Sequence, residues 1–118
     1  MKILAIGAHP DDIEPQIGGT LAKFAAEGAE VLLVAATSTS TGASSVNARD
    51  DEGRRAAKCI SAKYLSLSID PNEFMYSRKF IAIFDELFLS EMPDLVFSVN
   101  VKDSHHEHQF VSQCIQSA

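Results

Sequence analysis

The sequence predicts an α/β protein with three layers, α/β/α, built around a mostly parallel sheet. Three observations lead to this fold class. Short apolar runs alternate with amphipathic segments along the chain, which is the pattern of right-handed βαβ units. The chain has 118 residues and is 46% hydrophobic, which suits one domain, residues 1–118, with a core of its own. Reactive side chains follow the apolar runs, where a parallel sheet carries its binding site.

The first part of the chain predicts a strand, a helix and a second strand. Residues 3–6 are an apolar run that ends at a glycine, as in a strand buried on both faces of a parallel sheet. Residues 15–28 predict a helix, because Pro15 suits a first helical position and Gly28 suits a helix end. Residues 31–36 are a second apolar run and predict the next strand.

The middle of the chain predicts a helix and a short third strand. Asn47 is suited to cap a helix over residues 48–61, which carries alanine and isoleucine on one side. Residues 64–67 predict the strand, and the turn-rich sequence IDPNEF follows it.

The last part predicts two more helices with a strand between them. Residues 77–91 have a strongly apolar face, and Pro93 ends this helix. Residues 94–99 predict the fourth strand, and a final helix begins near Ser104. The carboxyl ends of parallel strands meet at one edge, so the loops after the strands are expected to lie together there. This arrangement is Rossmann-like.

The charge and the cysteines exclude several classes of partner. The formal net charge is −6 and the ten basic residues are scattered, which argues against a nucleic-acid surface. No apolar stretch approaches the length of a membrane span, and the N-terminal apolar run is too short for a secretory signal. Cys59 and Cys114 form no CxxC pair and predict reduced thiols. We therefore expect a cytoplasmic protein that acts on a small molecule.

All four histidines lie in two loops, after the first and the fourth predicted strands. His9, Asp12 and His108 offer two imidazoles and one carboxylate, a common ligand set of catalytic zinc, which keeps a position for water. Asp11 is left free beside that water, where a carboxylate can accept its proton.

Plainer roles are open for several of these residues. Asp11 or Asp12 could cap the helix that follows, and Ser104 with Glu107 matches a capping box. His106 is expected to be a solvated surface residue. The metal interpretation is preferred because a parallel sheet brings the two histidine-bearing loops together.

Two segments resemble the signatures of the PIG-L / LmbE-like N-acetylglucosaminyl deacetylases. These segments are AHPDDIEPQIGG and PDLVFSVNVKDSHHEH. The family pattern is AHPDDE followed by a glycine pair, then PD-x-V and D-x-H-x-D-H. The chain departs from it at Ile13, where the family usually has glutamate, at Pro15 and Gln16, where small or apolar residues are usual, and at Glu107, where aspartate is usual.

The resemblance implies a zinc-dependent hydrolase that removes the acetyl group from an N-acetylglucosamine-containing small molecule or glycoconjugate. Another divalent ion such as Fe²⁺ is compatible with the same ligands. The implied site residues are His9, Asp12 and His108 as metal ligands, Asp11 as general base, His105 as oxyanion stabiliser, Arg49 and Asp70 as substrate contacts, and Asp103 and Glu107 as carboxylates behind them.

Family members typically continue well beyond the second histidine motif, so the resemblance also predicts a domain truncated at its C-terminus. The missing strands would leave apolar surface that favours a homo-oligomer. A competing hypothesis is therefore a non-catalytic metal- or sugar-binding domain that is active only within a larger assembly. A non-haem Fe(II) oxygenase would use the same three ligand types, although on a different scaffold. A dinucleotide-binding module is disfavoured because the sequence has no G-x-G-x-x-G after the first strand.

Overall fold

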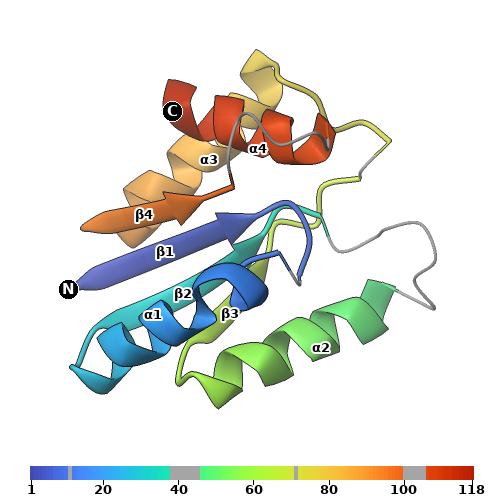
Figure 1. Ribbon diagram of the computed structural model, residues 1–118. Helices are drawn as coiled ribbons and strands as arrows, with labels where there is room; N and C mark the ends of the chain where they lie inside the picture. Colours follow the sequence, from blue (N-terminus) through green and yellow to red (C-terminus); the bar gives the residue numbers. More distant parts are fainter. Residues whose placement is uncertain (11, 38–45, 71, 100–105) are drawn as a thin grey trace.

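Four parallel strands form one sheet in the order β3-β2-β1-β4 (Figure 1). The computed structural model describes residues 1–10, 12–37, 46–70, 72–99 and 106–118. The strands are β1 (Lys2–Gly7), β2 (Glu30–Ala35), β3 (Lys63–Ser66) and β4 (Leu95–Ser98), and the helices are α1 (Glu14–Ala26), α2 (Val46–Cys59), α3 (Arg78–Glu91) and α4 (His106–Ser117). The predicted α/β class with a parallel sheet is confirmed.

The helices cover the two faces of the sheet in pairs, which gives the three layers. Leu4 and Ile6 of β1 belong to the core beneath α3 and α4. Ile3 and Ala5, which alternate with them, belong to the core beneath α1 and α2. All four side chains are fully buried. A strand buried on both faces needs an uninterrupted apolar sequence, which is why β1 could be predicted from its composition.

The core beneath α3 and α4 contains the largest of the fully buried side chains, Phe84. Phe80 and Leu87 lie on the same face of α3, at helical spacing, and are also buried. The opposite face of this helix is exposed, and Leu89 there is 75% exposed. Among the described segments, none of the helices combines the length and the apolarity that crossing a membrane requires.

The predicted helix ends agree with the structure at some residues and not at others. Gly28 follows the C-terminal turn of α1 with φ of +97°, a backbone conformation that glycine adopts without strain. The prediction that Asn47 precedes a helix is wrong, because α2 already begins at Val46. The reason is general: sequence patterns fix the existence of a helix better than its first residue.

The chain order creates a switch point between β1 and β4. β2 and β3 extend the sheet on one side of β1, whereas the crossover through α3 returns the chain to its other side (Figure 1). Loops that leave neighbouring strands in opposite directions open a crevice at the carboxyl edge, where α/β proteins bind ligands. The loop after β1 and helix α4 after β4 therefore begin side by side. At the outer edge of the described sheet, Leu95 of β4 is 37% exposed.

Candidate metal centre

The loop after β1 turns sharply at the carboxyl edge of the sheet. The backbone N–H of His9 donates a hydrogen bond of 2.7 Å to Oδ2 of Asp12, and the N–H of Asp12 donates one of 3.3 Å to the carbonyl of His9. The turn returns so closely that a Cβ on Gly7 would lie 2.8 Å from Cβ of Asp12. Gly7 is therefore required for this turn, which brings His9 and Asp12 onto the same side.

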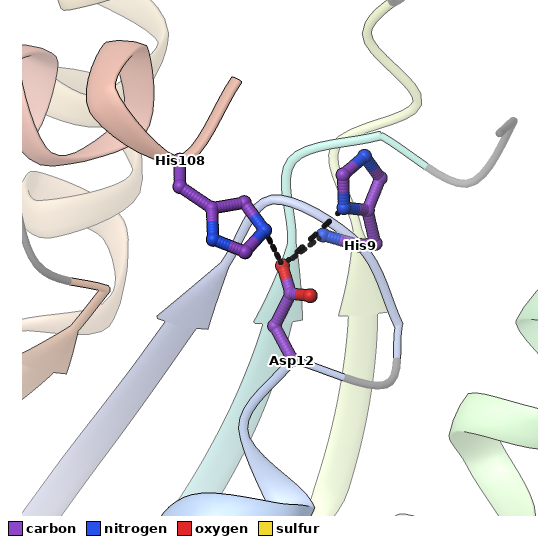
Figure 2. A group of neighbouring side chains, drawn as sticks. All are labelled: His9, Asp12 and His108. Carbon is purple, nitrogen blue, oxygen red and sulfur yellow. Dashed lines mark hydrogen bonds and ion pairs between the residues drawn. The ribbon is translucent and has the colours of Figure 1, made fainter. Parts of the chain in front are cut away.

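Helix α4 supplies the third side chain of the group from its first turn. His108 Nε2 lies 3.1 Å from Asp12 Oδ2, and His9 Nδ1 lies 3.5 Å from the same oxygen (Figure 2). The two imidazole rings are 5.5 Å apart between centroids and tilted by 49°. The structure thus brings together the three residues for which the sequence predicted a shared metal ion.

The donor set fits a divalent metal ion. One ligand atom from each of His9, Asp12 and His108 can be chosen so that all lie within 4.8 Å of one another. The side chains are 9%, 11% and 14% exposed, respectively, so the group lies in a largely enclosed position with access from outside. Two imidazoles and one carboxylate are a usual protein contribution to a catalytic zinc site, in which a fourth position stays open.

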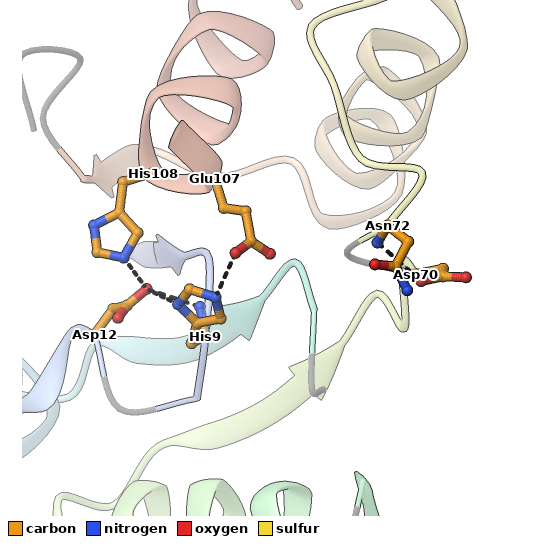
Figure 3. A network of polar contacts seen from close by, with 6 residues as sticks. All are labelled: His9, Asp12, Asp70, Asn72, Glu107 and His108. Carbon is orange, nitrogen blue, oxygen red and sulfur yellow. Dashed lines mark hydrogen bonds and ion pairs between the residues drawn. The ribbon is translucent and has the colours of Figure 1, made fainter. Parts of the chain in front are cut away.

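Glu107 lies behind His9 and contacts the ring nitrogen that points away from Asp12. Its Oε2 is 3.3 Å from His9 Nε2, and both residues are 9% exposed (Figure 3). With a metal ion bound at Nδ1, His9 would carry its proton on Nε2 and could donate it to the Glu107 carboxylate. Nδ1 then keeps its lone pair on the side of Asp12 and His108. Such a carboxylate fixes the tautomer and orientation of a metal-binding histidine.

The contacts within the group also shift two pKa values. The hydrogen bond to Asp12 raises the pKa of His9 above its usual value, against the opposing effect of burial. Burial alone would raise the pKa of Asp12, but the hydrogen bonds from His9 and the charge of His108 outweigh it and lower that pKa. Asp12 is therefore an ionised carboxylate at neutral pH, as a metal ligand must be.

The remaining predicted site residues have different places in the structure. Asp11, Asp103 and His105 lie outside the described residues. Arg49 is in the first turn of α2, and its side chain also lies outside the part of the chain that the structure describes. Asp70 is exposed in the turn after β3, where its Oδ1 accepts a 2.9 Å hydrogen bond from the backbone N–H of Asn72 (Figure 3).

Two further residues near this edge have informative positions. His106 is exposed, as expected, and its ring contacts the edge of Phe110 at 5.7 Å between centroids. Thr37, which the sequence patterns did not single out, is fully buried after β2, and its N–H donates a 2.8 Å hydrogen bond to the carbonyl of Ala8. This bond ties the end of β2 to the residue before His9. A threonine directly after an apolar run was the available signal.

The fold and the site define a class: a Rossmann-like α/β domain with a candidate metal site of two histidines and an aspartate at its switch point. Comparison with known proteins narrows this class. Residues 4–118 match the PIG-L family, described as GlcNAc-PI de-N-acetylase. The chain belongs to the PIG-L family.

Individual relatives agree with this membership. The uncharacterized deacetylase YaiS of Escherichia coli K12 is 30% identical over 119 residues, which cover 94% of this chain and 64% of YaiS. The solved N,N′-diacetylchitobiose deacetylase of Pyrococcus horikoshii is 27% identical and superimposes with a TM-score of 0.87, over 96% of this chain and 47% of that chain.

A second solved structure shows that this fold also occurs with another named reaction. The 4-carboxy-2-hydroxymuconate hydratase GalB of Pseudomonas putida KT2440 has a TM-score of 0.83 at 19% identity, over 98% of this chain and 54% of that chain. That likeness concerns the fold alone. The chain spans less than two thirds of the length of each of these relatives.

Proposed function

We propose that the protein is a zinc-dependent hydrolase that removes the acetyl group from an N-acetylglucosamine-containing small molecule or glycoconjugate. The observation that carries this proposal is the convergence of His9, Asp12 and His108 at the switch point, with Glu107 orienting His9. Membership of a deacetylase family supports the reaction class.

The residues divide the chemistry between them. A divalent ion, which His9, Asp12 and His108 would hold, would supply Lewis acidity to the amide carbonyl and would lower the pKa of water. Asp11 accepts the proton of the water molecule that adds to the acetyl carbon, and His105 stabilises the oxyanion that forms there. The C–N bond then breaks, acetate leaves, and the sugar nitrogen takes the proton to become an amine. The roles of Asp11 and His105 rest on the family motif.

The ligand types favour zinc but accept other ions. Two imidazoles and a carboxylate are common for zinc, and the same set also serves Fe²⁺. Asp12 Oδ2 lies within 3.5 Å of ring nitrogens from both histidines, so a small ion with short bonds needs only modest movement of the side chains. We propose Zn²⁺ as the resident ion and Fe²⁺ as its competitor.

The proposed substrate class comes from the relatives. The Pyrococcus horikoshii enzyme is named for N,N′-diacetylchitobiose, and the family description names an N-acetylglucosaminyl lipid. Both carry an acetamido sugar, which is the group that the site would hydrolyse. Arg49, in the first turn of α2, and Asp70, in the turn after β3, are proposed to contact the sugar or the group attached to it.

The test combines metal analysis with acetate release. Purified protein should contain about one zinc per chain, and it should release acetate from N,N′-diacetylchitobiose or N-acetylglucosamine. Asp11→Asn should keep the metal and lose about 10²- to 10⁴-fold in rate, as expected for a general base. Asp12→Ala should lose the metal as well as the activity. Full activity in Asp11→Asn with metal bound would refute the mechanism.

A second candidate function is favoured by the length comparison. The chain covers 47% to 64% of the length of YaiS and the two solved relatives described above. A metal- or sugar-binding domain that hydrolyses its substrate only within a larger assembly fits this fact. Zinc and glucosamine binding without acetate release would favour this candidate over the enzyme.

A further inference from the structure

Tyr64 of β3 packs against helix α2 and bonds to it. Tyr64 Oη donates a hydrogen bond of 2.8 Å to Oδ1 of Asp50, whose side chain is largely buried at 8% exposure. One helical turn later the tyrosine ring touches the helix backbone itself. A Cβ added to Gly53 would lie 2.5 Å from Cε2 of Tyr64 and 2.8 Å from its Cζ. A residue larger than glycine at this position would force the ring and the helix apart.

These contacts set how closely α2 approaches β3 and where α2 lies along its own axis. The Arg54 guanidinium lies over the Tyr64 ring, 5.9 Å from its centroid, and pairs with Asp51 at 2.9 Å. Among the strands, α2 packs chiefly on β3. A hydrogen bond at one turn and a ring against bare backbone at the next allow α2 little freedom to slide or rotate.

Asp50, Gly53 and Tyr64 join the two segments of the chain that carry the proposed substrate contacts. Figure 1 shows α2 beginning at the edge toward which the strands point, and β3 ending at that same edge. Arg49 directly precedes Asp50 on α2. Asp70 is in the turn that follows the strand of Tyr64. The separation of residues 49 and 70 therefore depends on how α2 is seated on β3.

We propose that Asp50, Gly53 and Tyr64 are positioning residues that set the placement of Arg49 relative to Asp70 and so determine substrate affinity. This inference rests on the proposed function. The three residues lie on the α2 side of the sheet and make no described contact with His9, Asp12 or His108. Their effect is therefore on substrate binding and leaves the metal centre intact.

The experiment is a kinetic comparison of Tyr64→Phe with the parent protein, using N,N′-diacetylchitobiose. The variant keeps the ring against Gly53 and deletes only the hydroxyl that bonds Asp50. KM should rise about three- to tenfold, the effect of losing one hydrogen bond, while kcat and zinc content stay unchanged. Tyr76→Phe is the matched control, because its hydroxyl bonds Ser117 at 2.7 Å on an exposed surface, and KM should not change there.

A second background separates positioning from general weakening of the fold. In Arg49→Ala, adding Tyr64→Phe should raise KM no further, because the residue being positioned is gone. An unchanged KM in folded Tyr64→Phe, or the same rise in both backgrounds, overturns the inference while the proposed function stands. A parent protein that binds zinc but releases no acetate overturns the proposed function, and this inference with it.

Discussion

Replacement of Glu107 by alanine tests whether this carboxylate prepares His9 for metal binding. Glu107 Oε2 lies 3.3 Å from His9 Nε2 at a site where both residues are 9% exposed, so solvent screens the contact weakly. Without the acceptor, His9 is free to protonate Nδ1 instead, the nitrogen that faces Asp12 and His108. Loss of such a partner weakens metal binding by about 10- to 100-fold, or about 1.4 to 2.8 kcal/mol.

The assay is competition for zinc against a chromophoric chelator, with circular dichroism to verify the fold. Glu107→Gln should lose less affinity than Glu107→Ala, because an amide oxygen still accepts the hydrogen bond. Glu86→Ala, which removes an exposed glutamate from α3, is the control and should bind zinc like the parent. Parental affinity in Glu107→Ala would refute the reasoning. Equal losses in the glutamine and alanine variants would show that charge, and not the hydrogen bond, is what matters.

Three further predictions concern pH and stability. Because the pKa of His9 is raised, protonated His9 stabilises the metal-free fold at low pH, and this contribution is lost as the pH rises through the raised pKa. Because the pKa of Asp12 is lowered, ionised Asp12 stabilises the fold above the usual carboxyl range, and this contribution is lost as the pH falls through the lowered pKa. In urea unfolding with EDTA present, His9 and Asp12 should thus add most to the free energy of unfolding at mildly acidic pH. Zinc affinity should fall as the pH is lowered, because protons compete with the metal for His9. Phe84→Ala removes a fully buried ring and should cost about 3 to 5 kcal/mol of unfolding free energy in the same assay. Met92→Gly should raise the free energy of unfolding by about 0.5 to 1 kcal/mol, because Met92 ends α3 at φ of 47° and its side chain is 71% exposed. A free energy of unfolding below that of the parent would refute backbone strain at Met92.

The strands at the centre of the sheet were the easiest part to predict. β1 and β2 are buried on both faces, so burial dictates an apolar residue at nearly every position and leaves a pattern in the sequence. The order of the strands left no such pattern. β4 has the apolar sequence LVFS, typical of an interior strand, yet it lies at an edge of the described sheet. Strand order depends on which helix crosses the sheet, and that is decided by packing between distant segments.

The candidate site divides in the same way. The ligand types were readable, because histidines confined to two loops are rare and a parallel sheet gathers such loops at one edge. The residues that position the site could not all be predicted from the sequence. Glu107 also matched a capping box, and only the fold shows its carboxylate against His9. The contact of Tyr64 with Asp50 and Gly53 joins a strand to a helix and follows no local spacing rule.

The position of the candidate metal site would link ion binding to the stability of β4. His9 and Asp12 precede α1 beside the central strand β1, whereas His108 is in the first turn of α4, which packs on β1 and on β4. β4 pairs with β1 on one side, and its Leu95 is 37% exposed, so it has less burial to hold it than β1 has. An ion shared by the two segments would need α4 in place to reach all three ligands. Its binding would therefore stabilise this arrangement by mass action, by about 2.7 kcal/mol at a free-ion concentration 100 times the dissociation constant. The ion proposed to serve hydrolysis would thus also hold the edge of the sheet that builds its site.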